Sequence, residues 1–170
     1  MPAPQEATFL ATLNPHLGVV HRVCRLYCRD PAERQDLQQE ILYQLWKAYP
    51  GFQGTAQFST WLYRVALNTA LTYERQRRRT PAAAPLEAWA LEVAAPAEGP
   101  EAEQQRLLYA TIEQLSAVDK AVVLLYLEEQ SYVQIADVTG LTVSTVSVRL
   151  VRIRKKLAQA LTGSLAHLNA

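Results

Sequence analysis

The sequence predicts an all-α protein made of two small helical modules that are joined by a flexible, acidic linker. Apolar residues recur every three or four positions through most of the chain, which is the spacing of a buried helix face. Residues 80–105, TPAAAPLEAWALEVAAPAEGPEAEQQ, contain four prolines and many alanines and glutamates. This composition is typical of a linker, with a short helical turn expected at Leu86–Val93. We therefore expect one module at residues 1–79 and the other at 106–170.

Three helices are expected in the first module. They span roughly residues 8–29, 32–49 and 59–78, and Pro50-Gly51 ends the second one. A glycine-containing loop with two phenylalanines, PGFQGTAQF, separates the last two helices. The apolar positions expected to face the core are Leu13, Leu17, Val20, Cys24 and Tyr27 in the first helix, Leu37, Ile41, Leu45 and Ala48 in the second, and Trp61, Leu62, Val65, Leu71 and Tyr73 in the third.

The second module is also expected to be helical, beginning with a helix over roughly residues 101–115. Ser116–Asp119 has the spacing of a capping box and precedes an apolar run, and Ser131–Gln134 repeats this signature. Gly140 is expected to end the helix that Ser131 begins, and Thr142 to cap the next one. Two capped helices joined by a short turn make a helix-turn-helix, in which Ile135 and Val138 can pack beneath.

The segment at residues 143–156, VSTVSVRLVRIRKK, could be a strand or a helix. Its β-branched residues favour a strand. A strand, however, would place basic residues on its apolar face, whereas a helix gathers the apolar residues into one stripe and leaves the cations outside it. We therefore predict a helix, with a buried stripe of Val146, Leu150, Ile153 and Leu157.

The outer surface of this helix suits duplex DNA. Residues 51–80 and 131–170 each carry five basic and one acidic residue, whereas residues 81–130 carry two basic and nine acidic ones. Outward valines fit thymine methyl groups, and cations fit phosphates or guanine edges. The alternative is a solvated basic helix whose valines pack on a partner. Ser144, Val148, Val151 and Lys155 lie opposite the buried stripe, Arg149, Arg152 and Lys156 form one flank, and Ser147 and Arg154 form the other.

The first module combines aromatic rings, amides and cations, as a single-strand-binding surface does. The basic run from Arg75 to Arg79 ends the third helix. Spacing alone leaves open whether the aromatic residues bind bases or form the core, but Trp61 and Tyr63 cannot both face inward. The aromatic residues are Phe52, Phe58, Trp61, Tyr63 and Tyr73, interleaved with Gln53, Gln57, Arg64 and Asn68.

The residues do not predict a metal site, a cofactor or a catalytic centre. His21, Cys24 and Cys28 share a helix face, but buried cysteine is an ordinary apolar residue and structural zinc takes four ligands. There is no nucleophile–histidine–acid pattern and no phosphate-binding glycine loop. We therefore expect no enzyme activity and no small-molecule substrate. The sequence contains neither a signal-peptide pattern nor a long apolar run, so we expect a cytoplasmic protein.

Two long segments resemble a known family. DLQQEILYQLWKAYPGFQGTAQFSTWLYRVALNTALTYERQRRR resembles region 2 of the bacterial sigma-70 family, and LSAVDKAVVLLYLEEQSYVQIADVTGLTVSTVSVRLVRIRKKL resembles region 4. The resemblance covers roughly residues 36–79 and 108–157. A chain that has only these two regions and a short linker resembles the extracytoplasmic function (ECF) subgroup of the family. A stand-alone helix-turn-helix regulator is the alternative, but it gives no reason for the first segment.

The resemblance implies partners and contact residues. Region 2 would bind the clamp helices of the largest RNA polymerase subunit and capture melted −10 DNA, while region 4 would read the −35 element and touch the polymerase flap. An anti-sigma factor is a further expected partner. The polymerase contacts would be Asp36, Gln39, Glu40 and Tyr43; the −10 contacts Phe52, Gln53, Thr55, Phe58, Trp61, Asn68, Arg75, Arg77 and Arg78; and the −35 contacts Ser144, Thr145, Ser147, Val148, Arg149, Val151, Arg152, Lys155 and Lys156.

The segment that resembles region 4 departs from the family pattern at three of the expected −35 contacts. Ser147 stands where the family often has a basic residue, and Val148 and Val151 replace more polar types. The family's −35 sequence therefore cannot be transferred to this chain.

Overall fold

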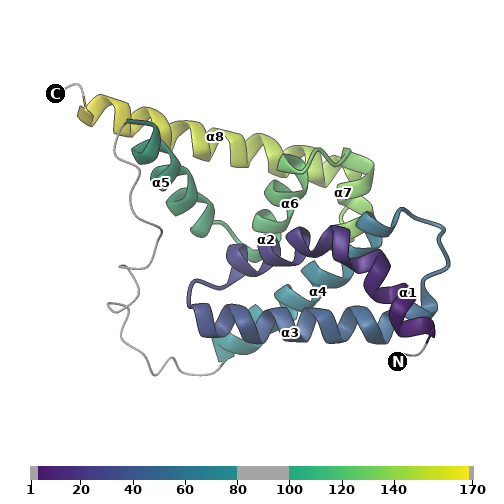
Figure 1. Ribbon diagram of the computed structural model, residues 1–170. Helices are drawn as coiled ribbons and strands as arrows, with labels where there is room; N and C mark the ends of the chain where they lie inside the picture. Colours follow the sequence, from purple (N-terminus) through teal and green to yellow (C-terminus); the bar gives the residue numbers. More distant parts are fainter. Residues whose placement is uncertain (1–3, 80–99, 169–170) are drawn as a thin grey trace. The chain divides into compact units, whose positions relative to one another are not determined.

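The computed structural model describes residues 4–79 and 100–168 (Figure 1). The chain divides into two compact units, residues 1–83 and 84–170. Every regular element in the described ranges is helical, which confirms the predicted all-α class. The turn expected at Leu86–Val93 lies outside the described residues, together with most of the predicted linker. The last residues of that linker, from Pro100 on, belong to a helix.

The first unit begins with a broken helix where the sequence predicted a continuous one over residues 8–29. The reason is Pro15, which has no N–H to donate to the preceding turn and whose ring clashes with it. A 3₁₀ turn at Asn14–His16 therefore separates two helices. The elements of this unit are α1 (Pro4–Leu13), η1 (Asn14–His16), α2 (Leu17–Tyr27), α3 (Pro31–Ala48), η2 (Tyr49–Gly51) and α4 (Phe58–Arg79).

The core of the first unit lies where α2, α3 and α4 pack against one another. Most of the predicted positions on the first two helix faces are buried, but Leu17 is half-buried and Ala48, at the end of α3, is exposed. On α4 the buried face is rotated from the predicted one, because small alanines at 66 and 70 allow close helix packing. Trp61, Val65, Leu71 and Tyr73 are only half-buried. The buried face of α4 includes Leu62, Tyr63, Ala66, Leu67 and Ala70.

The second unit has the predicted helix ends. Ser116 accepts a hydrogen bond from the Asp119 amide, and Ser131 forms a complete capping box with Gln134. Gly140 ends its helix with φ 74°, the left-handed conformation that favours glycine. Thr142 accepts a 3.2 Å bond from the Thr145 amide and so caps the next helix. The helices are α5 (Pro100–Glu113), α6 (Ala117–Leu127), α7 (Tyr132–Thr139) and α8 (Val143–Leu168).

The segment at residues 143–156 is helical, as predicted, and forms the first half of α8. Val146, Leu150 and Ile153 are at most 2% exposed, while Leu157 is half-buried. This stripe packs on α6 and α7, where Ile135 and Val138 are also buried. None of the helices in the described ranges is both long enough and apolar enough to span a lipid bilayer.

Candidate nucleic-acid interface

The outward surface of α8 is partly apolar. Val148 is 56% exposed and Val151 is 62% exposed, so neither belongs to the core of the unit. Ser144 and Lys155 are also exposed on this side, as the helical spacing predicts. Thr145 and Ser147 are half-buried, and the Thr145 hydroxyl lies 2.8 Å from that of Thr142. The predicted −35 residues therefore divide into outward-facing side chains and side chains that support the turn.

Two arginines of α8 contact α6. Nη1 of Arg149 donates a 2.7 Å hydrogen bond to the Asp119 carboxylate, and the two side chains are 28% and 24% exposed. The Nε of Arg149 is buried without a hydrogen-bond partner. The guanidinium of Arg154 lies over the Tyr126 ring, 4.6 Å from its centroid, a cation–π contact. Both side chains are thus held against the unit that carries them.

A cluster of aromatic rings joins the loop before α4 to the start of that helix. The rings of Phe52, Phe58 and Trp61 have centroids 5.1 to 5.6 Å apart. Two rings that contact these three directly were not predicted from the sequence: Tyr49, 6.4 Å from Trp61, and His16, 5.2 Å from Phe58. The only available sequence signal was their position beside Pro50 and Pro15, respectively.

The burial of these aromatic residues bears on the two interpretations left open by the spacing. Tyr63 is buried, whereas Phe52, Phe58 and Trp61 are half-buried. Tyr63 is therefore a core residue, while the cluster packs on itself and keeps part of each ring accessible. Such a surface can stack a base.

The accessible side of α4 continues from this cluster toward its basic end. Trp61, Asn68 and Arg75 are seven residues apart, a spacing that keeps them on nearly the same side of a helix. Asn68 and Arg75 are exposed, as are Gln53 and Thr55 in the preceding loop. An aromatic ring, an amide and a guanidinium thus follow one another along α4.

The other two predicted arginines of α4 have carboxylate partners. Arg77 donates a 2.7 Å bond to Glu33 at the start of α3, and Arg78 donates one of the same length to Glu74. Partial burial lowers the pKa of Arg77, but the hydrogen bond and charge of Glu33 outweigh burial, so its pKa is raised. A phosphate that binds these arginines must compete with Glu33 and Glu74.

The four predicted polymerase contacts form one exposed stripe on α3. Asp36, Gln39, Glu40 and Tyr43 are all exposed, and Tyr43 is 56% exposed. They occupy positions i, i+3, i+4 and i+7, so they share one side of the helix. Leu37, Ile41 and Leu45 are buried on the opposite side. The α3 stripe is therefore available to a partner.

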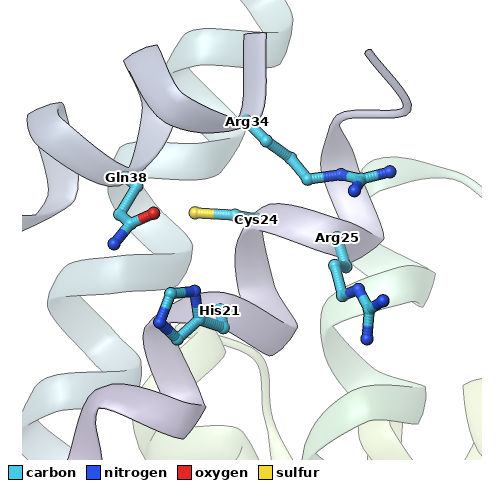
Figure 2. Close-up of a pocket in the computed structure, with 5 residues that line it drawn as sticks. All are labelled: His21, Cys24, Arg25, Arg34 and Gln38. Carbon is cyan, nitrogen blue, oxygen red and sulfur yellow. The ribbon is translucent and has the colours of Figure 1, made fainter. Parts of the chain in front are cut away.

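Among the described residues, the histidine and cysteine side chains considered for zinc belong to no group of three or more His, Cys, Asp or Glu side chains that could hold a metal ion. Cys24 and Cys28 are buried, and His21 is exposed. Cys24 lines a pocket of about 330 Å³ together with His21, Gln38 and two arginines, Arg25 and Arg34 (Figure 2). The Arg34 guanidinium donates to the backbone carbonyl oxygens of residues 28 and 29. Two nearby guanidinium groups make this pocket unfavourable for a metal cation.

Family models match both units. The model for sigma-70 region 2 matches residues 13–80, and the model for sigma-70 region 4 matches residues 105–157. Together these matches cover well over half of the chain. The chain belongs to the sigma-70 family. The structural units thus correspond to regions 2 and 4 of a sigma factor.

Relatives place this sigma-70 family chain in the ECF group. It is 33% identical to the RNA polymerase sigma-H factor of Pseudomonas aeruginosa over 85% of this chain and 79% of that protein. It is 30% identical to the ECF RNA polymerase sigma-E factor of Escherichia coli over 81% of this chain and 79% of that protein. A match to the ECF sigma factor SigG of Mycobacterium tuberculosis is 38% identical, but covers only 45% of this chain and 21% of SigG.

Two solved structures have a similar fold. The sigma factor RpoE of Bartonella quintana, crystallised with the anti-sigma factor NepR, matches with a TM-score of 0.71 and 21% identity over 91% of this chain and 97% of RpoE. CnrH, solved with the cytosolic domain of CnrY, matches with a TM-score of 0.63 and 23% identity over 91% of this chain and 88% of CnrH. The family is one of transcription regulators rather than enzymes.

Proposed function

We propose that this chain binds core RNA polymerase and directs promoter-specific initiation by reading duplex −35 DNA and melted −10 DNA. The observation that carries the proposal is the presence, in one chain, of a capped helix-turn-helix and of a separate unit with an accessible aromatic cluster. Residues 1–79 act as region 2, 80–105 as the linker and 106–170 as region 4.

Region 2 would use two surfaces. The exposed α3 stripe, from Asp36 to Tyr43, would bind the clamp helices of the polymerase. The aromatic cluster and the exposed side of α4, from Trp61 to Arg75, would hold the melted −10 strand. Stacking on the rings, hydrogen bonds to the Asn68 amide and attraction of the phosphates to Arg75 fit single-stranded DNA. Gln53 and Thr55 lie exposed on the loop beside the cluster and would contact the same strand.

Region 4 would place α8 in the major groove, as the second helix of a helix-turn-helix does. Ser144, Val148 and Val151 would face the bases. Arg152, Lys155 and Lys156 are exposed and would meet phosphates, which supply most of the affinity of such complexes. The remaining proposed −35 residues, Thr145, Ser147 and Arg149, are half-buried and would support the helix from its sides.

The likeness to RpoE supports an anti-sigma factor as a further partner, since RpoE was crystallised with the anti-sigma factor NepR. We further propose that the chain acts on promoter DNA in the cytoplasm and, as a member of a family of transcription regulators, has no enzyme activity of its own. The flap of the polymerase is the proposed contact for region 4.

The decisive experiment is run-off transcription with core polymerase that contains no other sigma factor. Promoter templates come from a genomic library of the source organism, and each is transcribed with and without the full chain. We expect transcripts with defined start sites only when the chain is present. If no promoter yields a transcript and the chain binds duplex operators by itself, the stand-alone regulator is the correct interpretation.

A further inference from the structure

The part of α8 that would enter the groove has no available cation. In a helix-turn-helix the N-terminal residues of the second helix contact the base edges. Between Val143 and Val151 the basic residue is Arg149, and its guanidinium is bonded to Asp119 with Nε buried. An arginine held in this way cannot present its two-pronged donor pattern to guanine.

The exposed basic residues of α8 begin at Arg152, directly after Val151. Arg152, Lys155 and Lys156 are exposed, and in the part of the chain that the structure describes they have no carboxylate partner. Arg154 is held over Tyr126 instead. The surface is therefore divided: apolar and hydroxyl groups occupy the turns that face bases, and cations follow where the helix leaves the groove.

We propose that Val148 and Val151 select promoters by contacting thymine methyl groups in the −35 element. This inference rests on the proposed function and specifies how region 4 reads its site. The thymine methyl is the apolar group that the major groove presents, and it marks the base pair unambiguously. Val148 and Val151 are more than half exposed and stand three residues apart on one side of α8. Their burial against methyl groups would remove from water an apolar surface that the free protein exposes.

The test removes the methyl group from DNA and leaves everything else unchanged. The strongest −35 duplex is first selected from a randomised pool with the complete holoenzyme, formed from core polymerase and the full chain. Each thymine of that duplex is then replaced singly by deoxyuridine, and binding is measured by competition. We expect affinity to fall about fourfold at one or two thymines, the effect of exposing one buried methyl group.

Variants assign the methyl contact to the valines. Val148→Ala and Val151→Ala should each lose the distinction between thymine and deoxyuridine at one position and retain it elsewhere. Both side chains are exposed and alanine favours helix, so the variants should fold. Val133→Ala is the matched control, because Val133 is a 67% exposed valine on α7, outside the proposed surface. It should retain every thymine preference of the unaltered chain.

The possible results separate the two proposals. If the holoenzyme selects no duplex from the pool, the proposed function fails. If it selects a duplex but tolerates deoxyuridine at every position, the proposed function stands and thymine reading by the valines is wrong. Thymine preferences that persist in both valine variants would also overturn the inference, since another side chain would then contact the methyl.

Discussion

Asp119, in the first turn of α6, accepts a 2.7 Å hydrogen bond from Arg149 on α8, 30 positions along the chain. Both side chains are about one quarter exposed, so solvent weakens the ion pair less than it would at an open surface. The bond links the helix that precedes the helix-turn-helix to the helix that would enter DNA. We therefore expect the bond to position α8 as well as to satisfy two charges.

A double-mutant cycle tests this positioning role. Asp119→Asn and Arg149→Ala should each destabilise the second unit, and together they should cost about 1 kcal/mol less than the sum of the single effects. These free energies are measured by unfolding the full chain in urea and monitoring the second unit through hydrogen exchange at residues 117–153. Additive effects would show that the two residues are not coupled.

DNA binding by the same variants distinguishes positioning from base reading. If Arg149 acts through Asp119, both variants should weaken binding of the holoenzyme to the −35 duplex by a similar factor, because each frees the same helix. If Arg149 itself reads a base, Arg149→Ala should weaken binding far more than Asp119→Asn. Competition binding to one selected duplex is sufficient for this comparison.

The aromatic cluster leads to a prediction about promoter melting. Phe52→Ala should reduce open complexes about tenfold, since stacking of one base on an aromatic ring contributes ~1–3 kcal/mol. Permanganate reactivity of unpaired thymines in the −10 element measures open complexes, and binding to an isolated −35 duplex should be unchanged. Tyr109→Ala is the control, because Tyr109 is a 66% exposed aromatic residue of the other unit. An equal loss in both variants would exclude a specific role for Phe52.

Local sequence rules predicted the second unit well. Ser131 with Gln134, Gly140 and Thr142 each specify a helix end through hydrogen bonds or backbone conformation within a few residues. The periodicity of residues 143–156 was enough to choose helix over strand, since burying one stripe outweighs β-propensity. Features of this kind are readable because the interacting groups are neighbours in the chain.

Features that depend on distant residues were not predicted. Arg149 and Asp119, or Arg77 and Glu33, meet only once the helices have packed, and nothing in their spacing identifies the partner. The cations expected to contact DNA therefore included side chains that the fold holds by carboxylates. The break at Pro15 was different, because Asn-Pro is a local turn signal that the apolar spacing across it concealed.

The turn of the helix-turn-helix should depend on Gly140. Its φ of 74° is costly for residues with a Cβ, and outside Gly140 and its two chain neighbours no atom lies within 4 Å of a Cβ built there. Gly140→Ala should therefore lower the free energy of unfolding by about 1 kcal/mol through backbone strain alone, and Gly140→Asn by less. Gly163→Ala, in the helical interior of α8, should have the opposite sign and stabilise by about 0.5–1 kcal/mol. Urea unfolding measures the free-energy change of each variant. If Gly140→Ala and Gly163→Ala changed the stability in the same direction, the proposed strain at Gly140 would be contradicted.

Two buried thiols, Cys24 in α2 and Cys28 directly after it, predict a loss of stability at high pH. Burial raises the pKa of Cys24 from 9.0 to about 11, and that of Cys28 from 9.0 to about 12. The unfolded chain therefore releases these protons above pH 9 while the folded chain retains them, so the free energy of unfolding falls from pH 9 to about pH 11. Between pH 8 and pH 10 the two thiols should together account for a loss of about 3 kcal/mol.

Comparison with a double variant isolates this contribution from other titrating groups. Cys24→Ala/Cys28→Ala will be less stable at neutral pH because it leaves small cavities. It should, however, lose about 3 kcal/mol less than the unaltered chain between pH 8 and pH 10. Urea unfolding of both proteins at several pH values, in the presence of a reductant, measures the difference in slope. Parallel curves for the two proteins would mean that the unfolded chain does not ionise these thiols more readily than the folded one.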